Sequence, residues 1–321
     1  MAAPSINTLV LEDGAVRAKF SDTLDIDQQA HRLYLGDNWT GGVDVFDISG
    51  PEPHFLRTVR IRGSIYGVCA APSVGKVFVG VLPSAIAVID VSRDDGETKL
   101  IDTGGRAHTD LIDFDPVHGK LYAANRNEGF MVVLDGARDE LVARIDGLGP
   151  ALEQPRFNAG DGMVYLAGHG DNVLYQVDPE SDTLVATLPI GVPCGPNGLA
   201  INPKTNEALL ASSDRATAHT VVFDLAAREV SGVIPGCGCG DGAHYSAVAD
   251  RYFFAASGYP DGPLLGIFGG APVELLATVP TTRRASWVGF DETNGVVYLT
   301  GISEGKSALS SFALADVPGA L

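Results

Sequence analysis

Seven polar or ionisable residues recur along the chain at nearly constant intervals. They are Asp22, Tyr66, Asp110, Glu153, Asn197, His244 and Ser286. The intervals are 44, 44, 43, 44, 47 and 42 residues, so the sixth position fits the period least well. Three of the seven are carboxylates, and carboxylates gathered around one axis need a counter-charge or a retained proton. The pattern therefore predicts a site whose charge is balanced by a ligand, a metal ion or a shifted pKa.

These residue types fit acid/base chemistry. We expect His244 to move a proton near neutral pH, with Glu153 or Asp110 as its partner base. Tyr66 and Asn197 can donate hydrogen bonds to a developing oxyanion. Asp22 completes the expected catalytic set, and Ser286 is an expected substrate contact. The alternative interpretation is a water-filled channel mouth lined by polar groups.

A divalent cation is a second way to balance the acids. Asp110, Glu153, Asn197 and His244 come from four consecutive positions of the series. They offer three oxygen ligands and one imidazole, a set that hard or borderline divalent ions accept.

Three of the four cysteines form another candidate site. Cys194 lies three residues before Asn197, and Cys237 and Cys239 lie seven and five residues before His244. We therefore expect all three on one rim, close together. A thiolate site for zinc or copper, a disulfide from Cys194 to Cys237 or Cys239, and free thiols are all open interpretations.

Basic and aromatic residues are expected beside the acidic series. Arg106, His108 and Arg284 lie in the segments that lead into it, and Trp39 and His169 lie in turns expected on the same face. Arginine can clamp a carboxylate or polarise a carbonyl group. We expect this rim to orient an anionic or carbonyl-bearing substrate.

A repeated strand motif positions all of these residues. Its aromatic or apolar anchors are Tyr34, Phe78, Tyr122, Tyr165, Leu209, Phe253 and Tyr298, at intervals of 43 to 45 residues. Each repeat carries four strand signals separated by turns; in the third repeat they are Thr109–Phe114, Lys120–Asn125, Phe130–Leu134 and Glu140–Ile145. Four strands at this period are typical of a β-propeller blade.

The sequence thus predicts an all-β, seven-bladed β-propeller. The last repeat ends with its third strand, at Ser307–Leu314, and we expect residues 6–19 to supply the missing outer strand. We expect residues 1–321 to form a single domain, because no linker interrupts the period. Aspartates 47, 90, 135, 178 and 224 end the third strands, where an Asx turn starts the next hairpin.

The fifth repeat reads Gly195-Pro-Asn-Gly-Leu-Ala-Ile-Asn-Pro203, and the fourth carries Leu184-Val-Ala-Thr-Leu-Pro-Ile190. With Val133-Leu134-Asp135, these segments resemble the YVTN-repeat propellers, which include surface-layer repeats and streptogramin B lyase. The resemblance covers nearly the whole chain. It implies the blade architecture, and fold does not by itself give function.

Composition excludes several classes of function. The 321 residues carry 22 Lys and Arg against 40 Asp and Glu, a net charge of −18, which argues against nucleic acid and anionic membranes as partners. No stretch of about 18 apolar residues is present, and no basic leader is visible. We expect a cytoplasmic protein, with a mature exported chain as the alternative, and a monomer or small homo-oligomer.

Motifs for nucleotide cofactors and for nucleophilic serine chemistry are absent from the sequence. We therefore expect an enzyme of the lyase, hydrolase or cyclase type that acts on a small molecule at the channel mouth, with or without a divalent cation. The alternative is a propeller without catalytic activity that binds a metabolite, peptide or protein on that face.

Overall fold

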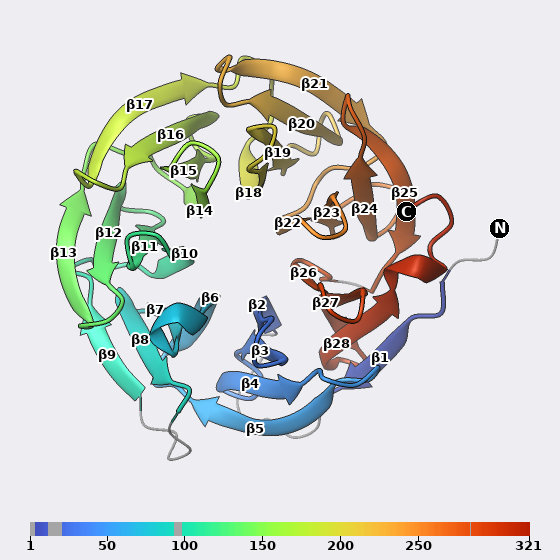
Figure 1. Cartoon of the computed structure of the whole chain (residues 1–321), viewed down its shortest axis with the longest axis horizontal. Helices are drawn as coiled ribbons and strands as arrows, with labels where there is room; N and C mark the ends of the chain where they lie inside the picture. Colours follow the sequence, from blue (N-terminus) through green and yellow to red (C-terminus); the bar gives the residue numbers. More distant parts are fainter. Residues whose placement is uncertain (1–3, 12–20, 93–97, 283) are drawn as a thin grey trace.

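Seven four-stranded antiparallel sheets surround a central axis in the computed structural model, as blades of a propeller (Figure 1). The structure describes residues 4–11, 21–92, 98–282 and 284–321. In each blade the first strand along the chain lies nearest the axis and the last lies at the periphery. The blade 7 sheet departs from this order, because its outermost strand comes from the start of the chain. The prediction of a seven-bladed propeller is confirmed.

Blades 1 to 4 follow one another along the chain. Their strands are β2 (Ser21–Asp27), β3 (Arg32–Asp37), β4 (Gly42–Asp47), β5 (His54–Arg60), β6 (Ser64–Ala71), β7 (Lys76–Leu82), β8 (Ala85–Asp90), β9 (Thr98–Asp102), β10 (Thr109–Asp115), β11 (Lys120–Asn125), β12 (Phe130–Asp135), β13 (Glu140–Ile145), β14 (Leu152–Asn158), β15 (Met163–Gly168), β16 (Val173–Asp178) and β17 (Thr183–Pro189). Blades 5 to 7 consist of β18 (Pro196–Asn202), β19 (Glu207–Ser212), β20 (His219–Asp224), β21 (Glu229–Pro235), β22 (Ala243–Ser246), β23 (Arg251–Ala256), β24 (Leu264–Gly269), β25 (Glu274–Pro280), β26 (Val288–Asp291), β27 (Val296–Ser303) and β28 (Lys306–Ala313), with β1 (Asn7–Val10). The helices among the described residues are two short 3-10 turns, η1 (Pro72–Val74) and η2 (Leu314–Asp316).

Strand β1 closes the ring as the outer strand of blade 7. It pairs antiparallel with β28, in a register that joins Asn7 to Ser311 and Val10 to Ala308. Leu11 extends the pairing, because its amide donates to the carbonyl of Ser307 over 2.9 Å. The predicted closure by residues 6–19 is therefore seen over its first part, and residues 12–19 lie outside the described residues.

The core lies between neighbouring blades. Each hydrophobic cluster joins two adjacent sheets; one of them packs Tyr122 and Val133 of blade 3 against Leu166 and Tyr175 of blade 4. The anchor residues of the repeat are buried, and Tyr122, Tyr165 and Tyr298 are among the largest fully buried side chains. This face-to-face packing fixes the blades around the axis.

The hairpins are fixed by the predicted Asx turns. Asp135 ends β12, and its Oδ1 accepts hydrogen bonds from the amides of Ala137 and Arg138, both over 3.0 Å. Asp47 does the same for Ser49, and Asp224 for Ala226. These aspartates therefore have the structural role that the sequence predicts.

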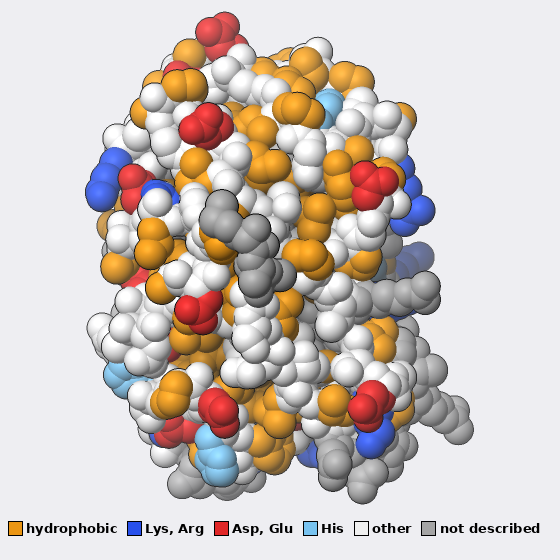
Figure 2. All heavy atoms as spheres, turned by 90° about the vertical axis from the view of Figure 1, so that its right-hand side faces the viewer, with side chains coloured by type: hydrophobic (Ala, Val, Ile, Leu, Met, Phe, Trp, Pro, Cys, Tyr) orange, Lys and Arg blue, Asp and Glu red, His pale blue; other side chains and the backbone are white. Residues whose placement is uncertain are grey.

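The periphery is formed by strands with one face packed inward. β21 alternates exposed and half-buried residues along its whole length, as outer strands of a propeller do. On the side of the ring shown in Figure 2, hydrophobic side chains are dispersed among polar atoms, with isolated acidic side chains between them. Within the described residues, no helix is long and apolar enough to cross a membrane.

Candidate functional site

A β-bulge in the inner strand aims the polar series at the axis. In blade 1, Ser21 pairs with Asp37 and Leu24 with Leu35, so Asp22 and Thr23 together oppose the single residue Gly36. The same shift occurs in blades 2, 3 and 4, at Tyr66, Asp110 and Glu153, and a related one occurs in blade 5 at Asn197. Bulges re-aim side chains and often lie beside functional sites.

The residue opposite the bulge is small because the next blade comes close. A Cβ atom built on Gly80 would lie 2.3 Å from the carbonyl oxygen of Asp110 and 2.7 Å from that of Thr109. The backbone of blade 3, including the bulge that carries Asp110, therefore rests directly on the Gly80 backbone. Glycine at this position permits the close approach.

In blades 1 to 5 the bulge also gives the inner strand a second residue that faces the channel, and the equivalent residues of blades 6 and 7 line the same space. Residues three apart in a regular strand point to opposite faces, and the extra residue of the bulge brings both to the same side. The second ring is Asp25, Cys69, Asp113, Arg156, Ala200, His244 and Gly289. Its intervals are 44, 44, 43, 44, 44 and 45 residues, so it follows the repeat without a break.

Two cavities occupy the two ends of the channel. We call the upper cavity the one where the inner strands begin; it is lined by Asp22, Thr23, Tyr66, His108, Asp110, Leu111, Arg126, Glu153, Asp241, Ser286 and Trp287 and has a volume of about 320 Å³. A neighbouring hollow of about 360 Å³ shares Asp22, Tyr66, Asp241 and Ser286 with it. The lower cavity, about 340 Å³, contains the second ring, and Leu111 and Trp287 line both cavities.

The charge of the upper cavity is organised by Arg126, which follows β11. Its Nη1 lies 3.0 Å from Oδ2 of Asp110, and its Nη2 lies 2.5 Å from Oε1 of Glu153. Both carboxylates are buried, with exposures of 4% and 2%. One guanidinium therefore serves two buried acids from neighbouring blades.

A single positive charge does not balance this set of acids. Burial, and next the neighbouring Asp110, raise the pKa of Glu153 well above its usual range, although Arg126 acts in the opposite direction. Burial also raises the pKa of Asp241, against the hydrogen bond that Asn197 Nδ2 donates to its Oδ1 over 2.6 Å. Arg126 is thus the cation shared by the two acids, and burial favours the protonated form of Glu153.

His108 and Tyr66 form one wall of the upper cavity. Their rings stack with centroids 4.2 Å apart, and His108 Nε2 lies 3.4 Å from Oδ2 of Asp110. The stack gives the cavity an aromatic surface beside its carboxylates. Such a surface suits a ligand with both an apolar face and polar groups.

The structure corrects the placement of His244. Its position in the upper series belongs to Asp241, which lies 44 residues after Asn197 and 45 before Ser286 and lines the upper cavity with Asp22 and Tyr66. His244 lies three residues further along and lines the lower cavity. The prediction for this blade was wrong because β22 begins only at Ala243, after a glycine-rich segment.

Some of the other predicted substrate-contact residues line the upper end of the channel, and the rest lie away from it. His108, Ser286 and, in the neighbouring hollow, Arg284 line the upper end of the channel. Asn197 does not line the upper cavity, but its side-chain amide donates a hydrogen bond to Asp241, which does.

Arg106 is exposed, and its amide donates to Glu128. His169 Nδ1 lies 3.2 Å from both the Gly195 carbonyl and Ser213 Oγ, and Trp39 donates its amide to Asp37. None of these last three residues lines the described cavities.

The residues proposed for a metal ion do not form a suitable cage. Asp110 and Glu153 both contact Arg126, and His244 lies in the other cavity. Among the described residues, no group of three or more His, Cys, Asp or Glu side chains is arranged to hold a metal ion. We derive no chemistry through a metal at this site.

Among the described residues, the cysteines do not form a metal site either. All four are free and buried. The loops of Cys194 and Cys239 do meet, because the Asp214 amide donates to the Cys194 carbonyl and Cys239 Sγ contacts the Asp214 carbonyl at 3.6 Å. Cys194 packs in the core of blades 4 and 5, and Cys237 packs in that of blades 5 and 6. Burial raises the pKa of each to about 12, which favours thiols over thiolates.

Three groups of residues at the two cavities were not predicted from the sequence. Asp241 could have been found from the period, because it restores intervals of 44 and 45 residues. The second ring, with Asp25, Asp113 and Arg156, follows the same period and lies three residues after the first series. The β-bulge that turns these side chains toward the channel cannot be recognised from residue types alone. Arg126 lies in a recognised turn, and only the folded hairpin shows that it reaches two acids.

No protein-family model matches this chain, and no curated protein matches it in a sequence search. The geometry of the two cavities therefore carries the functional argument.

Proposed function

We propose that the protein is an acid/base enzyme that acts on a small molecule in the upper cavity. The observation that carries the proposal is the pairing of two buried carboxyl groups, Asp110 and Glu153, with one guanidinium in a cavity of ligand size. Catalytic acids and bases are found where burial and like charges shift pKa values in this way.

Glu153 is the proposed general acid. Arg126 is shared with Asp110, and burial raises the pKa of Glu153, which favours its protonated form. Asp241 is the proposed general base, because burial raises its pKa but the hydrogen bond from Asn197 favours its ionised form. Groups whose environments differ in this way can give and take a proton in one turnover.

The proposed substrate is neutral or cationic. Arg126 is committed to two carboxylates, while Asp22 and Asp241 add further negative charge to the lining. This revises the expectation of an anionic substrate, because the arginine nearest the acids is already paired. Hydroxyl or amine groups on the substrate would find acceptors, and its apolar face would lie on Tyr66 and His108.

The reaction class is proposed as lyase, hydrolase or cyclase, because acid/base groups alone suffice for these. The alternative is a propeller that binds a metabolite, peptide or protein on this face without turnover. Membership of the YVTN-repeat group and a cytoplasmic location also remain proposals drawn from the sequence.

The test is to incubate the protein at pH 7 with a mixture of small polyols, lactones and amines and to follow their masses. A lyase splits the substrate into fragments whose masses sum to that of the substrate. A hydrolase adds one water across the bond that it cleaves, and a cyclase that isomerises leaves the mass unchanged while the retention time changes. For a converted compound, Glu153→Gln should lower turnover by about a hundredfold or more.

The control is Glu229→Gln, which makes the same change on the exposed outer strand β21. Binding of a compound without conversion by the wild type, with only its affinity altered in Glu153→Gln, would favour the binding protein instead. Full turnover in Glu153→Gln would remove Glu153 from the mechanism.

A further inference from the structure

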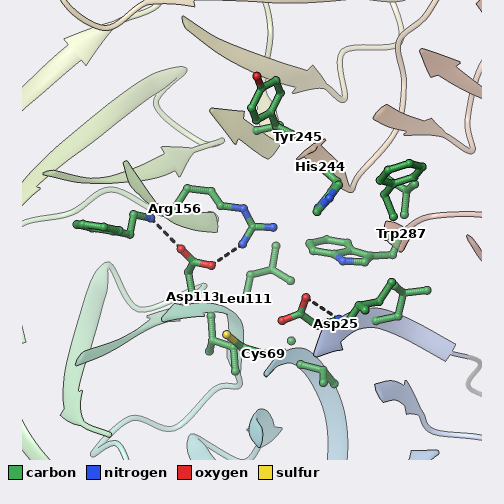
Figure 3. A pocket seen from close by; sticks show the side chains of 18 of the residues that line it. Asp25, Cys69, Leu111, Asp113, Arg156, His244, Tyr245 and Trp287 are labelled. Carbon is green, nitrogen blue, oxygen red and sulfur yellow. Dashed lines mark hydrogen bonds and ion pairs between the residues drawn. The ribbon is translucent and has the colours of Figure 1, made fainter. Parts of the chain in front are cut away.

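The lower cavity contains a second set of charged groups that the proposed function does not use. Figure 3 shows Asp25, Asp113, Arg156, His244 and Trp287 around one space. They come from blades 1, 3, 4, 6 and 7. The volume of the lower cavity, about 340 Å³, lies in the range of small-molecule sites.

Arg156 is committed to one of the two aspartates. Its Nη1 lies 2.8 Å from Oδ1 of Asp113, and the Phe157 amide donates to Oδ2 of the same carboxylate over 2.8 Å. Asp113 therefore has a cation on one oxygen and a backbone donor on the other. The charge of Asp113 is therefore balanced by Arg156.

Asp25 has backbone donors but no paired cation. The amides of Ile26 and Ala70 donate to its Oδ1 and Oδ2, each over 2.8 Å. Among the described residues, no arginine or lysine forms an ion pair with it. Because a carboxylate offers about four acceptor positions, two backbone bonds leave capacity for a ligand.

The remaining walls suit a cation. Burial, and then the charge of Arg156, lower the pKa of His244 to about 4, so its imidazole is neutral at physiological pH. Among the described residues, no hydrogen-bond partner reaches the buried Nε2 of His244. Trp287 supplies an indole beside these groups, and indole faces attract ammonium groups.

We propose that the lower cavity is a separate binding site for a small primary or secondary amine, whose ammonium group is held by Asp25 and whose body lies against Trp287. The charge of the cavity supports a cation over an anion, since one arginine faces two aspartates and Glu292 also lines the cavity. An ammonium group gives Asp25 the counter-charge that Arg156 gives Asp113.

The first experiment compares benzylamine with benzyl alcohol by calorimetric titration of the wild type at pH 7.5. The two probes share a ring and differ in charge. We expect saturable binding of one benzylamine per chain and at least tenfold weaker binding of the alcohol. Equal affinities, or no saturable amine binding, would overturn the proposal.

The second experiment uses matched variants on β2. Asp25→Asn should weaken benzylamine binding at least tenfold and leave the alcohol unaffected. Asp27→Asn is the control, because Asp27 lies on the same strand but accepts from the Gln29 and Ala30 amides in a turn. An equal loss in both variants would mean that the effect comes from the strand, which contradicts the proposal.

The same titration separates this site from the proposed active site. Amine binding that is lost in Glu153→Gln but kept in Asp25→Asn would place the amine in the upper cavity and overturn the present inference alone. Amine binding that depends on Asp25, together with full turnover in Glu153→Gln, would leave this site standing while the catalytic proposal fails.

A third measurement needs no variant. Burial raises the pKa of Asp25 to about 6, so its charge is mostly lost at pH 5 while benzylamine stays protonated. We expect about tenfold weaker binding at pH 5 than at pH 7.5. The other titratable or charged groups around the cavity are Cys69, Asp113, Arg156, His244, Tyr245 and Glu292. His244 stays neutral across this range, and a flat profile would contradict the role of Asp25.

Discussion

The upper and lower cavities each hold carboxylates beside one arginine, but they divide the positive charge differently. Arg126 touches Asp110 and Glu153 from two blades, whereas Arg156 pairs with Asp113 and leaves Asp25 to backbone amides. In the upper cavity two acids share one cation, whereas in the lower cavity Asp25 forms no ion pair with the residues that the structure describes. The first arrangement favours a retained proton, and the second favours a bound cation.

The largest expected effect separates the two arginines. Arg126→Gln leaves two buried acids without a cation, so we expect it to lower the free energy of unfolding at pH 7 by about 3–5 kcal/mol. Arg156→Gln removes one partner from Asp113, whose side chain is 18% exposed, and should cost about 1–3 kcal/mol. Denaturant unfolding at pH 7 measures both. Equal losses would show that pairing with two acids makes Arg126 no more stabilising than Arg156, which pairs with one.

A smaller effect is expected where the backbone of blade 3 contacts Gly80. Gly80→Ala places a Cβ against the carbonyls of Asp110 and Thr109, whereas Gly289→Ala, in the lower ring, meets the Leu24 side chain first, at 2.5 Å. Side chains can turn aside more easily than backbone. We expect Gly80→Ala to cost about 1–3 kcal/mol and Gly289→Ala less. Thermal unfolding compares the two variants. A greater loss of stability in Gly289→Ala would contradict the inferred close contact between the Gly80 backbone and the bulge of blade 3.

The third effect concerns the pH dependence of stability. The folded pKa of Asp25, about 6, lies above its ordinary value of 3.8 because of burial, so the folded state binds the proton more tightly than the unfolded state. Its contribution to stability is therefore greatest below pH 4 and falls as pH rises to about 6, by about 1 kcal/mol per pH unit. Asp25→Asn should remove this part of the slope. Unfolding free energies at several values between pH 4 and 7 test it, and an unchanged slope would show that Asp25 is not desolvated.

The blade architecture was predictable almost residue by residue. In the third repeat the expected strands differ from β10 to β13 only by one residue at the ends of β10 and β12. Continuous runs of buried residues form β11 and β12, and glycine or aspartate turns separate the strands, so each local signal agrees with the fold.

The candidate site was predictable only in part. The period located Asp22, Tyr66, Asp110 and Glu153, because inner-strand residues of every blade face one channel. It did not locate the ion pairs of Arg126, which depend on how far a side chain reaches from a hairpin. It also missed Asp25, because an extra residue in the strand changes which side chains face the axis.

The pairing of β1 with β28 has a consequence for how the ring is made. Thr8 and Ser310 lie 302 positions apart in sequence, yet their hydroxyl groups are 3.4 Å apart. During synthesis, β1 leaves the ribosome long before its partner strand exists. Six blades can form as their own hairpins emerge, but the seventh must wait for both ends of the chain to meet. Completion of the circle is therefore a late event that depends on a long loop closure, and until then β28 would present an open strand edge to other chains.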